Sequence, residues 1–142
     1  MSILGLDLGK RRIGVAIADV TALGARPLTT LIRRSWPRDL ELLRAIVADR
    51  QVSRIVLGLP LNMDGSEGPA ARGARAFAAR LRQELAVPVD LYDERLTSFE
   101  AEARLKDSPL PRNSRKMMVD QVAAALILEG WLAEHGAGKA SL

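Results

Sequence analysis

Hydrophobic and polar residues alternate in the first part of this chain, which is typical of strands. Residues 3–8 alternate, and residues 12–18 alternate again with Ile13, Val15 and Ile17 on one face. The link between these two segments is short enough for an antiparallel hairpin. Together with three later apolar segments, the pattern predicts five strands, at residues 3–8, 12–18, 27–33, 54–58 and 87–92.

Helices are predicted where apolar residues recur at intervals of three and four. Pro37 and Pro69 each suit a first helical turn, because proline lacks the amide hydrogen that this turn leaves unbonded. Thr97 and Glu100 have the capping-box spacing of a short helix that ends near residue 105. Ser114 is expected to cap the last helix, which continues to about residue 134.

The predicted order is three strands, then helices and strands in alternation, then two helices. An antiparallel meander followed by βα units gives a mixed five-stranded sheet with helices on both faces. This α/β order is that of the three-layer ribonuclease-H-like fold. The length of 142 residues suits one domain, which we expect at residues 1–135, with a flexible C-terminal tail at 136–142.

Asp7 is a carboxylate within an otherwise apolar strand. Alternation places it on the same face as Ile3 and Gly5. A buried carboxylate is unfavourable unless it is paired or bound to a metal, and Gly5 and Gly9 leave room for a metal or a phosphate. A strand-end role in binding turn amides is the alternative. The glycines and the basic residues that follow favour the functional role.

Three further acidic residues lie at the end of a predicted strand or in an apolar stripe. Asp93 and Glu94 follow the fifth strand, and ligand sites in α/β sheets gather at carboxyl ends of strands. Neighbouring side chains point in different directions, so only one is expected to join a site, and an ordinary polar turn is equally compatible. Asp120 interrupts the apolar stripe of the last helix, which favours a carboxylate aimed at the sheet over an exposed pair with Lys116.

Together, Asp7, Glu94 and Asp120 offer hard oxygen ligands, which select Mg²⁺ or Mn²⁺ rather than zinc. Such ions can activate a water molecule and stabilise the leaving oxygen in phosphodiester cleavage. The chain has no cysteine, which excludes thiolate catalysis and cysteine-based metal sites. Its one histidine, His135, lies near the end of the chain and is a poor candidate for a general base.

The net charge of +4 and the pI near 10.1 favour an anionic partner. Lys10, Arg11 and Arg12 form one basic cluster, and residues 104–116 hold five basic residues against one acidic residue. Nucleic acid is the natural partner of such clusters, although solvated surface patches have the same composition. No apolar run approaches the roughly 20 residues of a membrane helix, and the N-terminus does not resemble a signal peptide. We therefore expect a cytoplasmic protein without a membrane partner.

The loop between the fourth strand and the second helix has two interpretations. Asn62, Ser66 and the following helix N-terminus offer groups that can hold a phosphate. Ordinary turn and capping chemistry explains the same residues and is the simpler interpretation.

Four segments resemble the YqgF (RuvX) family: LGLDLGKRRIGVAIAD, IVLGLPLNMDGSEGP, DERLTSFEAEARL and VDQVAAALILEGWL. The resemblance covers residues 2–132. Members are bacterial proteins described as Holliday junction resolvases and as nucleases that mature the 5′ end of the small-subunit ribosomal RNA precursor. The resemblance implies a fold similar to that of the RuvC resolvase, and catalytic and metal-binding roles for Asp7, Glu94 and Asp120.

The sequence departs from RuvC-type enzymes at the fourth strand, which ends in Gly58 where those enzymes carry an acid. Asp93 and Asp64 therefore remain further candidates for the site, beside Glu94. The residues that we expect to contact nucleic acid are Lys10, Arg11, Arg12, Asn62, Arg95, Arg112, Arg115 and Lys116.

We expect a metal-dependent endonuclease that acts in 5′-end maturation of precursor 16S rRNA during ribosome biogenesis. The alternatives are a junction resolvase in DNA recombination and repair, or a nucleic-acid-binding protein without catalysis. The segment LDLGKRRIGVA also resembles the first phosphate loop of actin-like and sugar-kinase domains, but those proteins need two such domains to enclose ATP. Expected partners are precursor rRNA or branched DNA and ribosomal particles, for a monomer or weak homodimer.

Overall fold

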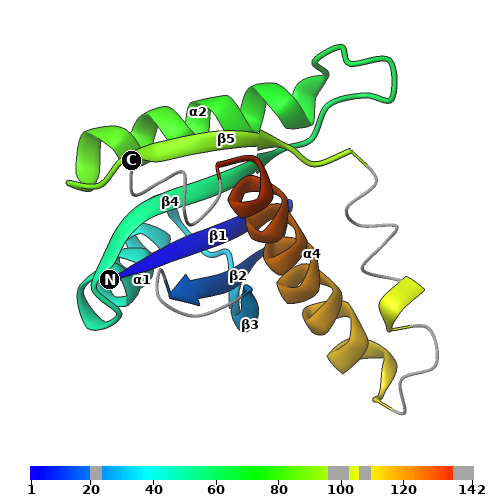
Figure 1. The fold of residues 1–142 in the computed structure, drawn as a ribbon, viewed down its shortest axis with the longest axis horizontal. Helices are drawn as coiled ribbons and strands as arrows, with labels where there is room; N and C mark the ends of the chain where they lie inside the picture. The colour runs from blue at the N-terminus through cyan, green and yellow to red at the C-terminus, as the bar shows by residue number, and fades with distance from the viewer. Residues whose placement is uncertain (20–23, 96–102, 106–109, 136–142) are drawn as a thin grey trace.

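The structure, a computed structural model, describes residues 1–19, 24–95, 103–105 and 110–135 (Figure 1). The strands are β1 Ser2–Leu8, β2 Arg12–Asp19, β3 Arg26–Ile32, β4 Val52–Leu59 and β5 Val89–Asp93. The long helices are α1 Trp36–Asp49, α2 Pro69–Glu84 and α4 Arg112–His135. All five strands and these three helices were predicted from the residue pattern, with end points that differ by up to two residues for most of them.

The five strands form one mixed sheet in the order β3-β2-β1-β4-β5. The β1–β2 and β2–β3 pairs are antiparallel, whereas the β1–β4 and β4–β5 pairs are parallel. The predicted antiparallel meander followed by βα units is therefore confirmed. Because β1, β4 and β5 run in the same direction, their carboxyl ends meet at one edge of the sheet, where ligand sites of α/β proteins gather.

Helices cover both faces of the sheet, as predicted (Figure 1). On one face, Leu4 and Leu6 of β1 pack in a core with Leu43 of α1 and Leu81 of α2. On the other face, Ile3 belongs to a smaller core that α4 completes. The alternation along β1 is thus as expected, and the face that carries Asp7 is the face covered by α4. Each fully buried leucine contributes about 1.5–3 kcal/mol to this packing.

Glycines let the backbone of α4 lie directly on the sheet. A Cβ atom on Gly14 of β2 would clash with the carbonyl oxygen of Asp120, and one on Gly5 would lie 2.8 Å from the carbonyl oxygen of Ala124. Gly14 is the cross-strand neighbour of Asp7 in the β1–β2 pair. The close contact at Gly14 therefore brings Asp120 to the part of the sheet that holds Asp7.

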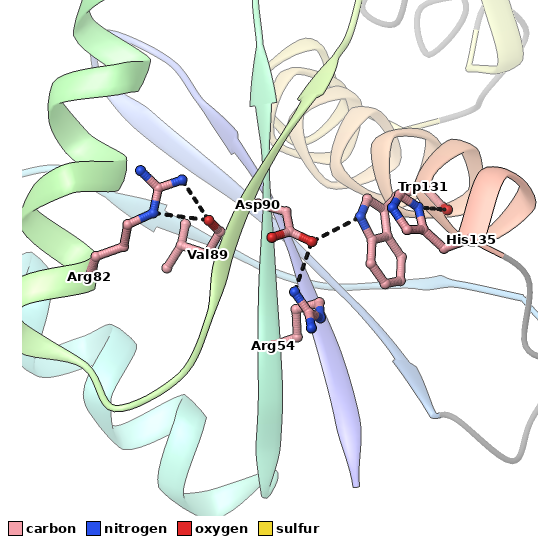
Figure 2. A network of polar contacts seen from close by, with 6 residues as sticks. All are labelled: Arg54, Arg82, Val89, Asp90, Trp131 and His135. Atoms are coloured by element: carbon pink, nitrogen blue, oxygen red, sulfur yellow. Dashed lines mark hydrogen bonds and ion pairs between the residues drawn. The ribbon is translucent and has the colours of Figure 1, made fainter. Parts of the chain in front are cut away.

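A polar network ties the C-terminal half of α4 to β4 and β5 (Figure 2). The Asp90 carboxylate accepts hydrogen bonds from Arg54 Nη1 at 2.9 Å and from Trp131 Nε1 at 3.2 Å. The His135 ring stacks on the Trp131 ring, with 4.1 Å between their centroids. Across β5, Arg82 of α2 donates to the carbonyl oxygen of Val89 at 2.6 Å. The Trp131–Asp90 bond fixes the C-terminal half of α4 against β5, and Arg82 fixes α2 against the same strand.

The expected cap of the last helix is wrong. The helix begins at Arg112, and the Arg115 amide donates to the carbonyl oxygen of Pro111 at 2.9 Å, so Ser114 lies within the first turn. Pro111 is suited to this boundary because the residue before a helix needs no amide hydrogen for an intrahelical bond. The predicted capping box at Thr97 and Glu100 and the predicted tail at 136–142 lie outside the described residues. In the described ranges, no helix is long and apolar enough to cross a membrane.

Candidate active site

A hydrogen-bonded pair of carboxyl groups, Asp7 and Glu94, lies at the carboxyl edge of the sheet. Asp7 is the penultimate residue of β1, and Glu94 directly follows β5 with 8% of its surface exposed. Burial raises the pKa of Asp7 from 3.8 to about 6. Burial, and next the Asp7 charge, raise the pKa of Glu94 from 4.5 to about 9. At neutral pH the pair therefore holds one proton between two oxygen-rich groups.

Gly58 allows these two carboxyl groups to meet. Strand β4 lies between β1 and β5, so the Glu94 side chain must cross β4 to reach Asp7. A Cβ atom on Gly58 would lie 2.6 Å from Glu94 Cδ and 2.6 Å from Ile127 Cδ1. The Glu94 amide donates to the carbonyl oxygen of Leu59 at 3.2 Å, which fixes the start of the crossing. Gly58, near the end of β4, thus leaves space for the carboxyl group of Glu94, which follows β5.

Asp120 lies near this pair, and its carboxylate forms an ion pair with Arg12. Its charge contributes to the raised pKa of Asp7, after burial. Arg12 Nε donates to Asp120 Oδ2 at 2.5 Å, and both side chains are partly exposed. The Asp120 partner in the described part of the chain is therefore Arg12 of β2, and not Lys116. Sequence reasoning had assigned Arg12 to nucleic acid and had no signal for this ion pair, because the two residues are 108 positions apart.

The donor atoms of Asp7 and Glu94 fit a hard divalent cation. Two carboxyl groups that share a proton offer oxygen ligands at the place where a cation can replace that proton. Because Gly58 has no side chain, the Glu94 carboxyl group can lie beside Asp7 inside the protein. Within residues 1–19, 24–95, 103–105 and 110–135, however, no group of three or more acidic, histidine or cysteine side chains is arranged to hold a metal ion. Asp120, the third predicted ligand, is engaged with Arg12 through its Oδ2 atom.

Asp93 and Asp64, the two further candidates for the site, are directed elsewhere. The Asp93 carboxylate lies 2.8 Å from Arg95 Nη2, and this ion pair is partly exposed. Asp64 is fully exposed, and hydrogen bonds from the Ser66 hydroxyl and amide lower its pKa. The neighbouring residues Asp93 and Glu94 therefore do point in different directions, as expected from strand geometry.

The loop after β4 is held together by its own polar groups. The Asn62 side-chain amide donates to Ser66 Oγ at 2.9 Å, and Gly65 has a φ angle of 87°, which favours glycine. Arg95 Nη1 donates to the carbonyl oxygen of Met63 at 3.1 Å, so Arg95 links the end of β5 to this loop. The contacts of Asn62 and Arg95 with nucleic acid remain predictions. Both side chains already have hydrogen-bond partners within the protein.

The remaining predicted phosphate contacts lie at two places on the surface. Lys10 and Arg11 are exposed in the β1–β2 turn, directly after the strand that carries Asp7. Arg112 and Lys116 are exposed in the first turns of α4, whereas Arg115 is partly buried. The Nε atom of Arg115 has no hydrogen-bond partner in the part of the chain that the structure describes.

These features define an α/β protein with a largely buried acidic pair at the carboxyl edge of a mixed sheet. The solved structure of RuvC from Thermus thermophilus has the same fold: the TM-score is 0.54 at 19% sequence identity, over 96% of this chain and 98% of that chain. This likeness confirms the ribonuclease-H-like fold that the element order predicted.

The particular family follows from the sequence comparison. The family model described as "RuvX: Holliday junction resolvase" matches residues 1–134, and the chain belongs to this family. A relative from Anaeromyxobacter sp. (strain K) is 53% identical over 132 residues, which cover 93% of this chain and 96% of that protein. A relative from Myxococcus xanthus (strain DK1622) is 47% identical over 135 residues, which cover 95% and 89%. Both relatives bear the name "Putative pre-16S rRNA nuclease".

Proposed function

We propose that this protein is a metal-dependent endonuclease that hydrolyses phosphodiester bonds in the 5′-end maturation of precursor 16S rRNA during ribosome biogenesis. The observation that carries the proposal is the largely buried Asp7–Glu94 pair, which β1 and the residue after β5 bring together. The name shared by the relatives at 53% and 47% identity supports the RNA substrate.

In this proposal, Asp7 and Glu94 hold Mg²⁺ or Mn²⁺, and Asp120 joins them when it separates from Arg12. A bound ion of this kind polarises a phosphoryl oxygen and makes a water molecule more acidic. The protein contributes the orientation of the carboxyl groups and their exclusion from bulk water. Release from Asp120 also frees the Arg12 guanidinium, which is well shaped to bind a phosphate through two hydrogen bonds.

The basic residues of the β1–β2 turn and of the start of α4 bind the phosphates of the substrate. Lys10 and Arg11 are exposed three and four positions after Asp7, and they support contact with phosphates next to the scissile bond. Arg112, Arg115 and Lys116 come from the helix that carries Asp120. Contacts of this kind position the substrate and make binding dependent on salt, without reading a sequence.

A parallel cleavage assay tests the proposal. Purified protein with Mg²⁺ or Mn²⁺ receives a precursor 16S rRNA fragment and a four-way DNA junction in separate reactions, with EDTA and the Asp7→Asn variant as controls. We expect defined cleavage of the RNA that both controls abolish. Cleavage of the junction alone supports the second candidate function, a Holliday junction resolvase, which the description of the matched family favours. Binding without cleavage of either substrate contradicts both nuclease functions.

We also propose that residues 1–135 form the whole nuclease domain, and that the protein acts in the cytoplasm on ribosomal particles as a monomer or weak homodimer. Sedimentation of the purified protein, alone and with small-subunit precursor particles, tests the oligomeric state and the association. A stable higher oligomer, or failure to sediment with the particles, contradicts these assignments.

A further inference from the structure

A basic cleft lies at the same edge of the sheet as the acidic pair, but on the face covered by α1 and α2. Two cavities of about 510 and 360 Å³ share Lys10, Arg33, Phe77 and Arg80 in their linings, so they belong to one concave surface. The larger cavity is also lined by Arg34 and Trp36. We call this surface the basic cleft and define it by these six residues.

The charge of the basic cleft favours an anion. Four of its defining residues are cationic, and the one acidic residue in the lining, Asp39, is buried and accepts a hydrogen bond from the Arg34 amide at 3.1 Å. No carboxylate in the described ranges forms an ion pair with Lys10, Arg34 or Arg80. Unpaired cations on a concave surface concentrate the electric field and attract a polyanion.

The basic cleft also holds flat aromatic surface, which is rare in this chain. Two of the five Phe, Trp and Tyr residues of the whole sequence line it. Arg80 lies over the Trp36 ring, 4.1 Å from its centroid, and Phe77 supports the same ring edge-on at 5.6 Å. Indole rings and guanidinium planes are surfaces on which unpaired bases stack, whereas paired bases in a duplex hide these faces. Cationic and stacking groups together therefore favour a single strand.

We propose that the basic cleft binds a single-stranded segment of nucleic acid beside the cleavage site. The phosphates of this segment contact Lys10, Arg34 and Arg80, and one unpaired base stacks against the Trp36–Arg80 surface. The identity of the ligand rests on the proposed nuclease function. Lys10 of the cleft follows Asp7 by three residues, and Gly9 between them lines the smaller cavity, so the cleft begins next to the strand end that carries Asp7.

A binding measurement in EDTA, where no cleavage takes place, tests this proposal. Fluorescence anisotropy follows a labelled, unstructured 12-nucleotide RNA and the same RNA as a blunt duplex. The test variant is Arg34→Ala with Arg80→Ala, and the matched control is Arg38→Ala with Arg72→Ala, which removes the same charge from exposed positions of α1 and α2 outside the cleft lining. We expect the test variant to lose about tenfold in single-strand affinity and to lower the salt slope by roughly 1.4, about 0.7 for each lost phosphate contact.

Tryptophan fluorescence provides the second readout. The chain has only two tryptophans, and Trp131 is buried on the other face of the sheet. We expect the unlabelled single strand to quench the emission, and the Trp36→Phe variant to lose this quenching while it keeps its fold. Equal losses of affinity in the test and control variants, equal affinity for duplex and single strand, or quenching that survives in Trp36→Phe would each overturn the assignment.

The outcome separates this inference from the proposed function. If wild-type protein cleaves the precursor RNA but single-strand binding does not depend on Arg34 and Arg80, the cleft assignment is wrong and the nuclease function stands. If single-strand binding depends on these arginines but no substrate is cleaved, the nuclease function is wrong and the cleft assignment stands.

Discussion

The Asp7→Asn variant should be more stable than the wild-type protein at neutral pH, although we expect it to be inactive. Asparagine keeps the shape of the side chain, removes one negative charge from the buried pair, and offers an amide donor to Glu94. A pKa that rises from 3.8 to about 6 corresponds to about 3 kcal/mol of lost stability when Asp7 is ionised. Because the folded protein can relax around a buried charge, we expect the variant to regain about 1–3 kcal/mol.

The gain should depend on pH in a defined direction. The folded protein holds the two protons more tightly than the unfolded chain, so its free energy of unfolding falls with pH wherever the unfolded carboxyls are ionised first. For Asp7 this interval runs from 3.8 to about 6, and for Glu94 from 4.5 to about 9. Below pH 3.8 both proteins carry neutral carboxyls, and their stabilities should agree. The difference should open between pH 4 and 6 and persist at higher pH.

Urea unfolding in EDTA between pH 4 and 9 measures this difference. In a thermal scan at pH 8, the same gain in stability should raise Tm by about 3 °C for each kcal/mol in a chain of this length. Asp49→Asn, which removes an exposed carboxylate at the end of α1, is the matched control and should change stability by about 0.5 kcal/mol or less. If Asp7→Asn is less stable than wild type at pH 8, or if its effect does not change with pH, an unfavourable buried charge on Asp7 is refuted.

Three further predictions address the metal, the glycine and the basic surface. Mg²⁺ or Mn²⁺ at 100 times its dissociation constant should stabilise the wild-type protein by about 2.7 kcal/mol at pH 8, and a thermal scan should show a smaller effect at pH 5, where protons compete. Gly58→Ala should abolish cleavage and cost about 1–3 kcal/mol, because its Cβ would displace Glu94. Gly73→Ala, whose Cβ meets no neighbour within 4 Å, is the stability control and should leave the free energy of unfolding nearly unchanged. Alanine at Arg112, Arg115 and Lys116 together should weaken RNA binding for many sequences alike and lower its salt dependence in an anisotropy titration, and an unchanged affinity and slope would show an inert surface.

The fold could be predicted because most of its elements have local causes. The alternation in β1 and β2 determines which residues face each helical layer, and it placed Asp7 on the face that α4 covers. Proline at the start of α1 and α2 marked both boundaries. The start of α4 was misjudged because serine is a frequent cap, whereas here the backbone of Pro111 provides the first acceptor.

The details of the candidate site depend on tertiary contacts that no local pattern contains. Glu94 and Asp93 are equivalent in the sequence, and only the register of β5 beside β4 directs Glu94 across Gly58. In the sequence, the lack of an acid at the end of β4 weakened the assignment of the site. In the structure, the glycine at this place, Gly58, is what allows Glu94 to contact Asp7. The ion pair of Arg12 with Asp120 likewise results from the docking of α4.

Glu94, and not its neighbour Asp93, supplies the second carboxyl group of the proposed active site. Single-turnover cleavage of the precursor 16S rRNA fragment by Glu94→Gln and Asp93→Asn, in Mg²⁺ and at saturating protein, distinguishes the two residues. We expect a loss of about a hundredfold or more for Glu94→Gln. Asp93→Asn loses only a surface ion pair with Arg95 and should keep nearly the wild-type rate. A wild-type rate for Glu94→Gln, or a large loss confined to Asp93→Asn, would show that Glu94 does not have this role.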